Sequence, residues 1–138
     1  MLDKIVDGIS EKLNEVFGLR IYTESVNQGL KPPCFLIHLV NPVNTRVLNK
    51  RFFRENLFDV RYFPGSDEPK TECYTMQDAL YLVLEYIMVD GDLQRGVRMR
   101  GELVDGVLHF FVNYNMIVVL TEEKTLMATH EKNISMKG

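Results

Sequence analysis

The sequence has few cysteines and no long apolar run, and both shortages exclude classes of protein. Its two cysteines, Cys34 and Cys73, match no CxxC or Cys/His metal-ligand spacing, which indicates reduced thiols in a cytoplasmic protein. No apolar stretch approaches the roughly 18 to 20 residues that span a bilayer. Because acidic residues interrupt the first ten positions, we expect no signal peptide there. Disulfide-built secreted proteins and membrane-spanning proteins are therefore excluded.

A strong charge of one sign is also absent. In 138 residues, 16 Lys and Arg oppose 19 Asp and Glu, which gives a net charge of −3 and argues against general nucleic-acid binding. Hydrophobic residues make up 46% and charged residues 25%, as in ordinary globular domains. We expect one domain over residues 1–120, followed by a flexible tail over residues 121–138 that shows no apolar period.

Apolar periodicity predicts two helices. In residues 2–17 apolar side chains recur at steps of three and four, and Gly18, which tolerates positive φ, ends the pattern. A second helix is expected from about Tyr74 to Ile87, with Asp90-Gly91-Asp92 as its stop signal.

Shorter patterns predict strands. The apolar run 34–40 is typical of a strand buried on most of both faces, residues 58–62 alternate as in a half-buried strand, and a short strand is expected at 20–25. Residues 43–51 are expected to form a polar connector. Residues 97–104 and 107–120 flank Asp105-Gly106, a dipeptide preferred in type I′ hairpins. The order α-β-β-β-α-β-β predicts an α+β fold, with one mixed or antiparallel sheet of about four to five strands, two flanking helices and a C-terminal β-hairpin.

No arrangement of residues points to catalysis, a metal or a cofactor. His38, His109 and His130 lie far apart, with no HxH or HxxxH spacing. The segment DGDL at 90–93 lacks the twelve-residue calcium-loop pattern, and neither GxGxxG before a helix, GxxxxGK nor GxSxG occurs. We therefore expect no enzymatic activity, no catalytic or metal-binding residues and no cofactor.

Charge is distributed unevenly along the chain. Residues 46–61 carry five basic and two acidic residues, a net charge of +3, whereas residues 62–93 carry one basic and seven acidic residues, a net charge of −6. Two interpretations stay open at this point. The segments form solvated faces of a monomer, or the positive patch of one copy meets the negative patch of the next in a contact that builds rings or filaments.

The basic segment also contains apolar residues that we expect to be exposed. Basic and aromatic residues interleaved in this way can bind single-stranded nucleic acid, but the acidic chain as a whole favours a protein interface. Arg98 and Arg100 are expected to share one strand face with Glu102, which suggests a partner there. The candidate interface residues are Arg46, Leu48, Lys50, Arg51, Phe52, Arg54, Arg98, Arg100 and Glu102.

Five segments, in their order and spacing, resemble a known family. They are LDKIVDGISEKLNEVFG, ESVNQGLKPPCFLIHL, LFDVRYFPGSDEPK, DGDLQRG and VDGVLHFFVNYNM, which together span residues 2 to about 118. The sequence resembles the phage tail terminator family, small proteins of tailed phages and phage-like elements. The resemblance brings no catalytic or metal-binding residue with it.

The resemblance implies a structural role in assembly of the virion. Members of this family form a ring, typically a hexamer, at the head-proximal end of the tail tube, where the ring stops tube polymerisation and offers a surface to the filled head. The implied partners are further copies of the chain, the tube protein, and sheath and neck or head-completion proteins, while DNA passes through the lumen without sequence readout. Assembly would take place in the host bacterial cytoplasm, without a membrane.

Two rival interpretations remain beside the terminator. One is a head-completion or neck connector protein of the same particle, which would bind on the portal side. The other is an enzyme or nucleic-acid-binding module of an unrelated class.

Overall fold

The chain, represented by a computed structural model, is described over residues 2–23, 29–121 and 135–137. Its helices are α1 (Leu2–Phe17) and α2 (Pro69–Val83). Its strands are β1 (Arg20–Thr23), β2 (Cys34–Leu39), β3 (Val43–Leu48), β4 (Arg51–Glu55), β5 (Leu57–Phe63), β6 (Tyr86–Val89), β7 (Asp92–Val104), β8 (Val107–Tyr114), β9 (Met116–Thr121) and β10 (Ser135–Lys137). The α+β class is confirmed, although the strands form two sheets instead of one and are more numerous than expected.

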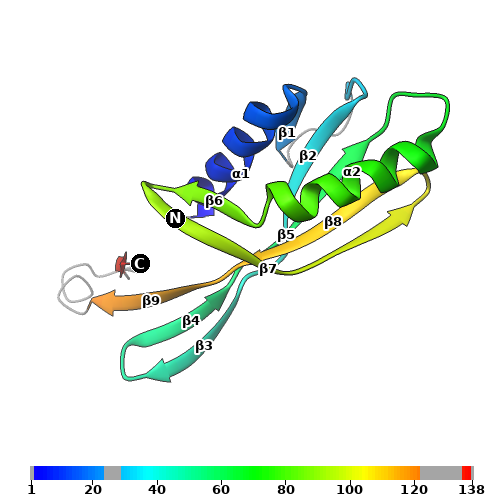
Figure 1. The fold of residues 1–138 in the computed structure, drawn as a ribbon. Helices are drawn as coiled ribbons and strands as arrows, with labels where there is room; N and C mark the ends of the chain where they lie inside the picture. Colours follow the sequence, from blue (N-terminus) through cyan, green and yellow to red (C-terminus); the bar gives the residue numbers. More distant parts are fainter. Residues whose placement is uncertain (1, 24–28, 122–134, 138) are drawn as a thin grey trace.

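Six strands form the main sheet, in the order β1-β2-β5-β8-β7-β6. Strands β1 and β2 pair in parallel, and the other neighbours pair antiparallel. Both helices lie against the same face of this sheet (Figure 1), and the core fills the space between them. We call the main sheet with its two helices the body. Its largest fully buried side chains include Tyr114, Phe35, Phe58, Phe110, Ile5, Ile9, Leu13, Leu80 and Leu84.

Helix α1 follows the sequence prediction. Ile5, Ile9 and Leu13, spaced four residues apart, are buried against the sheet. Gly18 adopts φ 65°, and its N–H donates to the Asn14 carbonyl at 3.0 Å, which closes the last turn. The expected C-terminal signal therefore acts as predicted.

The second helix ends earlier than the sequence indicated. Ile87 lies on β6, where Ile87 and Val89 are buried while Tyr86 and Met88 are exposed. Ile87 fits both the helical spacing of the preceding apolar residues and the alternation of a strand. The spacing of apolar residues alone therefore did not distinguish a helix from a strand here. Asp90 and Gly91 do not stop a helix; their φ values of 53° and 87° form the turn of the β6–β7 hairpin.

A second sheet, in the order β10-β9-β4-β3, replaces the polar connector expected at residues 43–51. Strand β3 falls within that segment, and each of its six residues is exposed. Strands β3, β4 and β9 extend away from the body, as Figure 1 shows. We call these three strands the arm, and the β3–β4 turn with its flanking residues 46–51 the arm tip.

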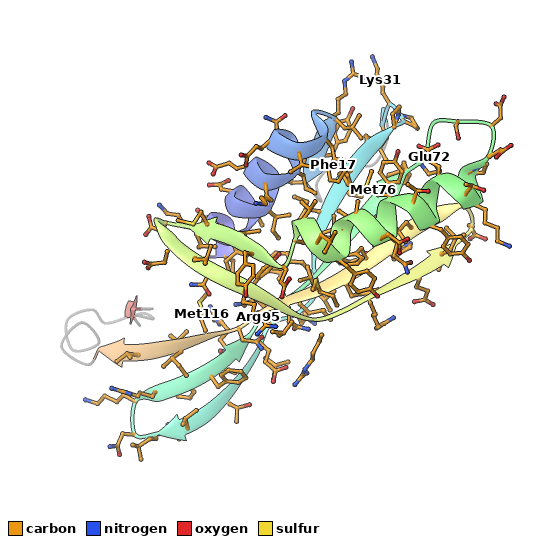
Figure 2. The ribbon with its side chains drawn as sticks, viewed as in Figure 1. Phe17, Lys31, Glu72, Met76, Arg95 and Met116 are labelled. Carbon is orange, nitrogen blue, oxygen red and sulfur yellow. The ribbon has the colours of Figure 1, made fainter. Side chains whose placement is uncertain are left out.

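Besides residues 40–42, which join β2 to β3, two chain segments cross between the body and the arm, and each is interrupted by an asparagine. Asn56 separates β4 from β5, and Asn115 separates β8 from β9. Asn56 is fully buried; its Nδ2 donates to the Tyr114 carbonyl at 3.0 Å, and its own carbonyl accepts the Tyr114 N–H at 3.0 Å. In Figure 2, Met116 marks the place where β9 leaves the body. These hydrogen bonds join the two crossing segments at the base of the arm.

The C-terminal hairpin is confirmed at its turn and extended at its ends. Asp105 and Gly106 have φ values of 50° and 78°, as a type I′ turn requires. Strand β7 begins at Asp92, five residues before the expected start. The flexible tail expected over residues 121–138 falls largely on residues outside the described ranges; Thr121 ends β9, and Ser135–Lys137 pair with it as β10.

The loop between β5 and α2 is held by the carboxylate of Glu72. Its Oε2 accepts hydrogen bonds from the Tyr62 hydroxyl and, at 3.1 Å, from the Gly65 N–H, while Oε1 accepts the Ser66 N–H at 2.9 Å. Partial burial alone would raise the pKa of Glu72, but the hydrogen bonds from Ser66, Tyr62 and Gly65 outweigh it and lower this pKa to about 2. Figure 2 shows Glu72 in the first turn of α2.

Glu72→Gln is expected to lower the free energy of unfolding by about 1–2 kcal/mol at pH 7, because the amide cannot accept all of these hydrogen bonds. Since the folded pKa is depressed, the stabilisation is present above the unfolded pKa of about 4.3 and disappears as the pH falls towards 2. Urea unfolding at pH 7 and pH 2.5 measures the difference, with Glu68→Gln, an exposed acid of the same loop, as control. An equal loss at both pH values would contradict this account.

Candidate assembly surfaces

The arm presents two faces, and the first combines cations with aromatic rings. Arg46, Phe52 and Val118 form one cross-strand row on it. The Arg46 guanidinium lies over the Phe52 ring, 5.1 Å from its centroid, and donates to the Asn49 carbonyl at 2.7 Å. The neighbouring Arg54 donates to Asn44 Oδ1 at 3.0 Å. This face is thus ordered by contacts within the arm.

The second face and the tip of the arm expose apolar side chains. Val43 and Ile117 are exposed on that face; Ile117 lies directly opposite Phe53, and Val43 lies one row further along, opposite Glu55. At the tip, Val47 and Leu48 expose 57% and 62% of their surface. Exposed apolar groups bordered by arginine and lysine are typical of a protein interface.

The candidate residues on β7 lie in two different settings. Arg98 occupies a bulge, with φ 53°, and its Nη1 lies 3.3 Å from Glu55 Oε1, which brings it to the base of the arm. Arg100 stacks on the Phe111 ring at 4.2 Å and lies 3.6 Å from Glu102. The structure therefore places the nine predicted residues in one group on the arm and its base and in a second group on the main sheet.

This second group belongs to the sheet face opposite the helices, which also holds a charged cluster that the sequence did not reveal. Asp59 Oδ2 lies 2.9 Å from His109 Nδ1 and accepts a hydrogen bond from Arg61 at 3.1 Å. Strand register brings these residues together from β5 and β8, which are far apart in the sequence. The alternation of Asp59 and Arg61 between buried apolar residues was the only signal available. Arg61 and Glu102 lie opposite His109 in the register.

A groove lies between α1 and β6, and sequence analysis missed it because β6 was expected to be helical. It encloses about 140 Å³ and is lined by Gly8, Glu11, Lys12, Glu15, Tyr86, Ile87, Met88 and Leu93. At Gly8 the helix approaches the strand so closely that a Cβ atom would lie 2.4 Å from the Met88 carbonyl oxygen. The glycine therefore sets the spacing between the two walls.

Neither cysteine forms a reactive site. Cys34 and Cys73 are both free and fully buried, and burial raises the pKa of each thiol. No helix within residues 2–23, 29–121 and 135–137 is long and apolar enough to cross a membrane. Over the same ranges, no three His, Cys, Asp or Glu side chains come together as a possible metal site.

A protein-family model described as phage tail terminator protein matches residues 4–126, which include the body and the arm. The chain belongs to the phage tail terminator family. No curated protein matches this family member. Among the solved structures that match it, one has 14% identity over 83% of this chain and 94% of its own, at a TM-score of 0.44, a likeness too loose to support an inference.

Membership of the tail terminator family indicates a structural role in phage tail assembly, and contacts with other tail components follow from that role. The surfaces available to this terminator for such contacts are the arm, the open face of the main sheet and the groove beside α1.

Proposed function

We propose that the protein forms a ring, hexameric as is typical of the family it resembles, that caps the head-proximal end of the phage tail tube. The ring pairs with the last subunits of the growing tube and stops polymerisation. Its opposite surface differs from a tube subunit and receives the neck and the filled head. DNA passes through the lumen without sequence readout, and the protein acts without catalysis, metal or cofactor.

The observation that carries this proposal is the arm. It extends from the body, exposes apolar and basic side chains, and ends in an edge strand, β3, whose outer side has no neighbour in the described sheets. Exposed apolar groups on such a projection favour a contact with another protein, and a subunit that contacts its neighbour with a different surface can close into a ring. Membership of the phage tail terminator family supports a place for this proposed contact in the tail.

The sequence-derived interface residues divide between two proposed contacts. The contact between ring neighbours is made by the residues of the arm and its base, which are Arg46, Leu48, Lys50, Arg51, Phe52, Arg54 and Arg98. Arg100 and Glu102, beside Phe111 on the open sheet face, serve the contact with the tube. One subunit thus offers separate surfaces to its neighbours and to the tube.

Deleting the gene is expected to produce overlong tails of variable length without heads, because nothing then stops tube growth. Electron microscopy of particles from the deletion strain measures tail length directly, and complementation with the intact gene is the control. Tails of normal length together with heads that leak DNA would assign the protein to the neck instead. Intact, infectious particles would overturn both assembly roles.

A further inference from the structure

The groove between α1 and β6 has an apolar floor and charged walls. On the strand side, Tyr86, Met88 and Leu93 all line it and are exposed. On the helix side, Glu11 and Glu15, which are exposed, line the groove together with the partly buried Lys12. Its volume of about 140 Å³ is close to that of the cavity of roughly 150 Å³ that accepts a benzene ring. The groove therefore has room for one aliphatic side chain with part of a second.

The arm tip has the opposite character. It presents two neighbouring aliphatic side chains, Val47 and Leu48, more than half exposed. Arg46, Lys50 and Arg51 surround them, and all three are exposed. The tip therefore presents a small apolar surface that is bordered by positively charged side chains.

We infer that the arm tip of one copy inserts into the α1–β6 groove of a second copy, with Val47 and Leu48 on the apolar floor and the basic residues of the tip against Glu11 and Glu15. This inference rests on the proposed function, since it names the surface through which ring neighbours join. The inference goes beyond the proposed function because it assigns both halves of the contact to named residues.

Charge supports this choice of occupant. Residues 43–55 contain four basic residues and one acidic residue, a net charge of +3. Residues 2–17 and 85–95, which form α1, β6 and the hairpin turn, contain seven acidic and three basic residues, a net charge of −4. Potentials of opposite sign on the two surfaces favour this pairing and disfavour tip-to-tip or groove-to-groove contacts.

The geometry makes the contact head-to-tail. In Figure 1 the arm points away from α1, so the tip fills the groove of another copy and not its own. Each copy then gives one tip and receives one tip. A contact of this kind is heterologous, and it continues from copy to copy until the rotation closes the ring.

A charge swap tests the inference with the full chain. One variant combines Lys50→Glu with Arg51→Glu, and another combines Glu11→Lys with Glu15→Lys. Each variant is expected to weaken self-association at least tenfold, or about 1.4 kcal/mol, because like charges then face each other. Combining all four substitutions in one chain is expected to restore it. Sedimentation equilibrium measures the association constant. The matched control is Lys31→Glu with Lys70→Glu, which reverses two exposed cations outside the arm.

Failure of the four-fold variant to recover association, or an equal loss in the control, would overturn the inference. Urea unfolding midpoints of all variants show whether each still folds. Because these residues are exposed, we expect the midpoints to stay close to that of the unchanged protein.

Directed disulfides give a second, independent readout. A mixture of Leu48→Cys and Met88→Cys chains is expected to form an intermolecular disulfide under mild oxidation, since bridged Cα atoms lie within about 7 Å. The native cysteines are buried and do not compete. The control mixture pairs Leu48→Cys with Leu82→Cys, whose position on α2 is exposed and outside the groove.

Cross-linking in solution and in tails purified from cells that express both variants distinguishes the two proposals. No disulfide above the control level in either sample would overturn the tip-in-groove contact. Overlong tails after gene deletion would still support the terminator role in that case. Normal tails after deletion, with a specific disulfide present, would overturn the terminator role and leave the contact standing.

Discussion

Phe110→Ala is expected to lower the free energy of unfolding by about 3–5 kcal/mol, because it leaves a cavity in the centre of the body. Phe110 lies on β8, the strand between β5 and β7, and is fully buried. The ring of Tyr81 from α2 meets it edge-on, with 5.0 Å between centroids and 83° between planes. The substitution therefore removes the contact that Phe110 makes with α2, including a favourable aromatic pair. Urea unfolding followed by circular dichroism measures the change.

The matched control is Leu82→Ala, on the same helix as Tyr81. Leu82 exposes 79% of its surface, so its truncation should change the stability by no more than about 0.5 kcal/mol. A loss below about 1 kcal/mol for Phe110→Ala, or a similar loss in both variants, would contradict the placement of the core. Because domains of this kind are stable by only about 5–15 kcal/mol, the expected loss leaves part of the protein unfolded at elevated temperature.

Gly96→Ala is expected to destabilise the protein by about 1–3 kcal/mol, although it adds only one methyl group. A Cβ atom at Gly96 would lie 2.7 Å from both the Leu84 carbonyl oxygen and Val112 Cγ2. That carbonyl is fixed, since it accepts the Tyr114 hydroxyl at 2.6 Å. The Gly96 N–H in turn donates to the Glu85 carbonyl at 2.6 Å. Backbone must therefore move where β7 passes the end of α2.

Gly101→Ala, on the same strand, separates this effect from the general cost of replacing glycine. The three atoms nearest to a Cβ atom there all belong to the flexible side chain of Gln77, which can rotate away. We expect the free energy of unfolding to rise, by no more than about 1 kcal/mol, because alanine reduces the conformational freedom of the unfolded chain. Thermal unfolding of both variants provides the comparison. Equal effects at the two positions would contradict the close approach at Gly96.

Much of the body could be predicted from the sequence because its elements have one buried face. In α1 the apolar spacing matches the helical period, and in β5 Phe58, Val60 and Tyr62 alternate as a half-buried strand requires. The turn at Asp105-Gly106 was recognisable from its residue types alone. Local chemistry was sufficient in these places.

The arm could not be predicted in the same way. Each residue of β3 is exposed, so no alternation between apolar and polar residues marks it as a strand. Its structure depends on pairing with β4, which in turn pairs with β9 from the other end of the chain. The basic residues of the arm could nevertheless be recognised from the charge pattern of the sequence. Their contacts could be identified only from the folded structure.

The groove beside α1 was missed for a different reason. Its walls come from residues 8–15 and 86–93, and the second wall was assigned to a helix because Ile87 continued the spacing of Leu80 and Leu84. A surface formed by two distant segments has no signature in either one. The uneven charge along the chain and the family resemblance, carried by the order of several segments, were the features that pointed beyond the single subunit.

The register of the main sheet has a consequence for how the chain reaches its folded state. Strand β5 pairs with β8 from Leu57–Asn113 to Tyr62–Leu108, so two central neighbours are separated by the whole of α2 and the β6–β7 hairpin. Closing so long a loop costs chain entropy before any contact repays it, which slows folding to roughly milliseconds or longer. The same late pairing also positions β9 beside β4. The pairing at the centre of the sheet and the pairing that completes the arm are therefore made by the same two stretches of chain, residues 51–63 and 107–121.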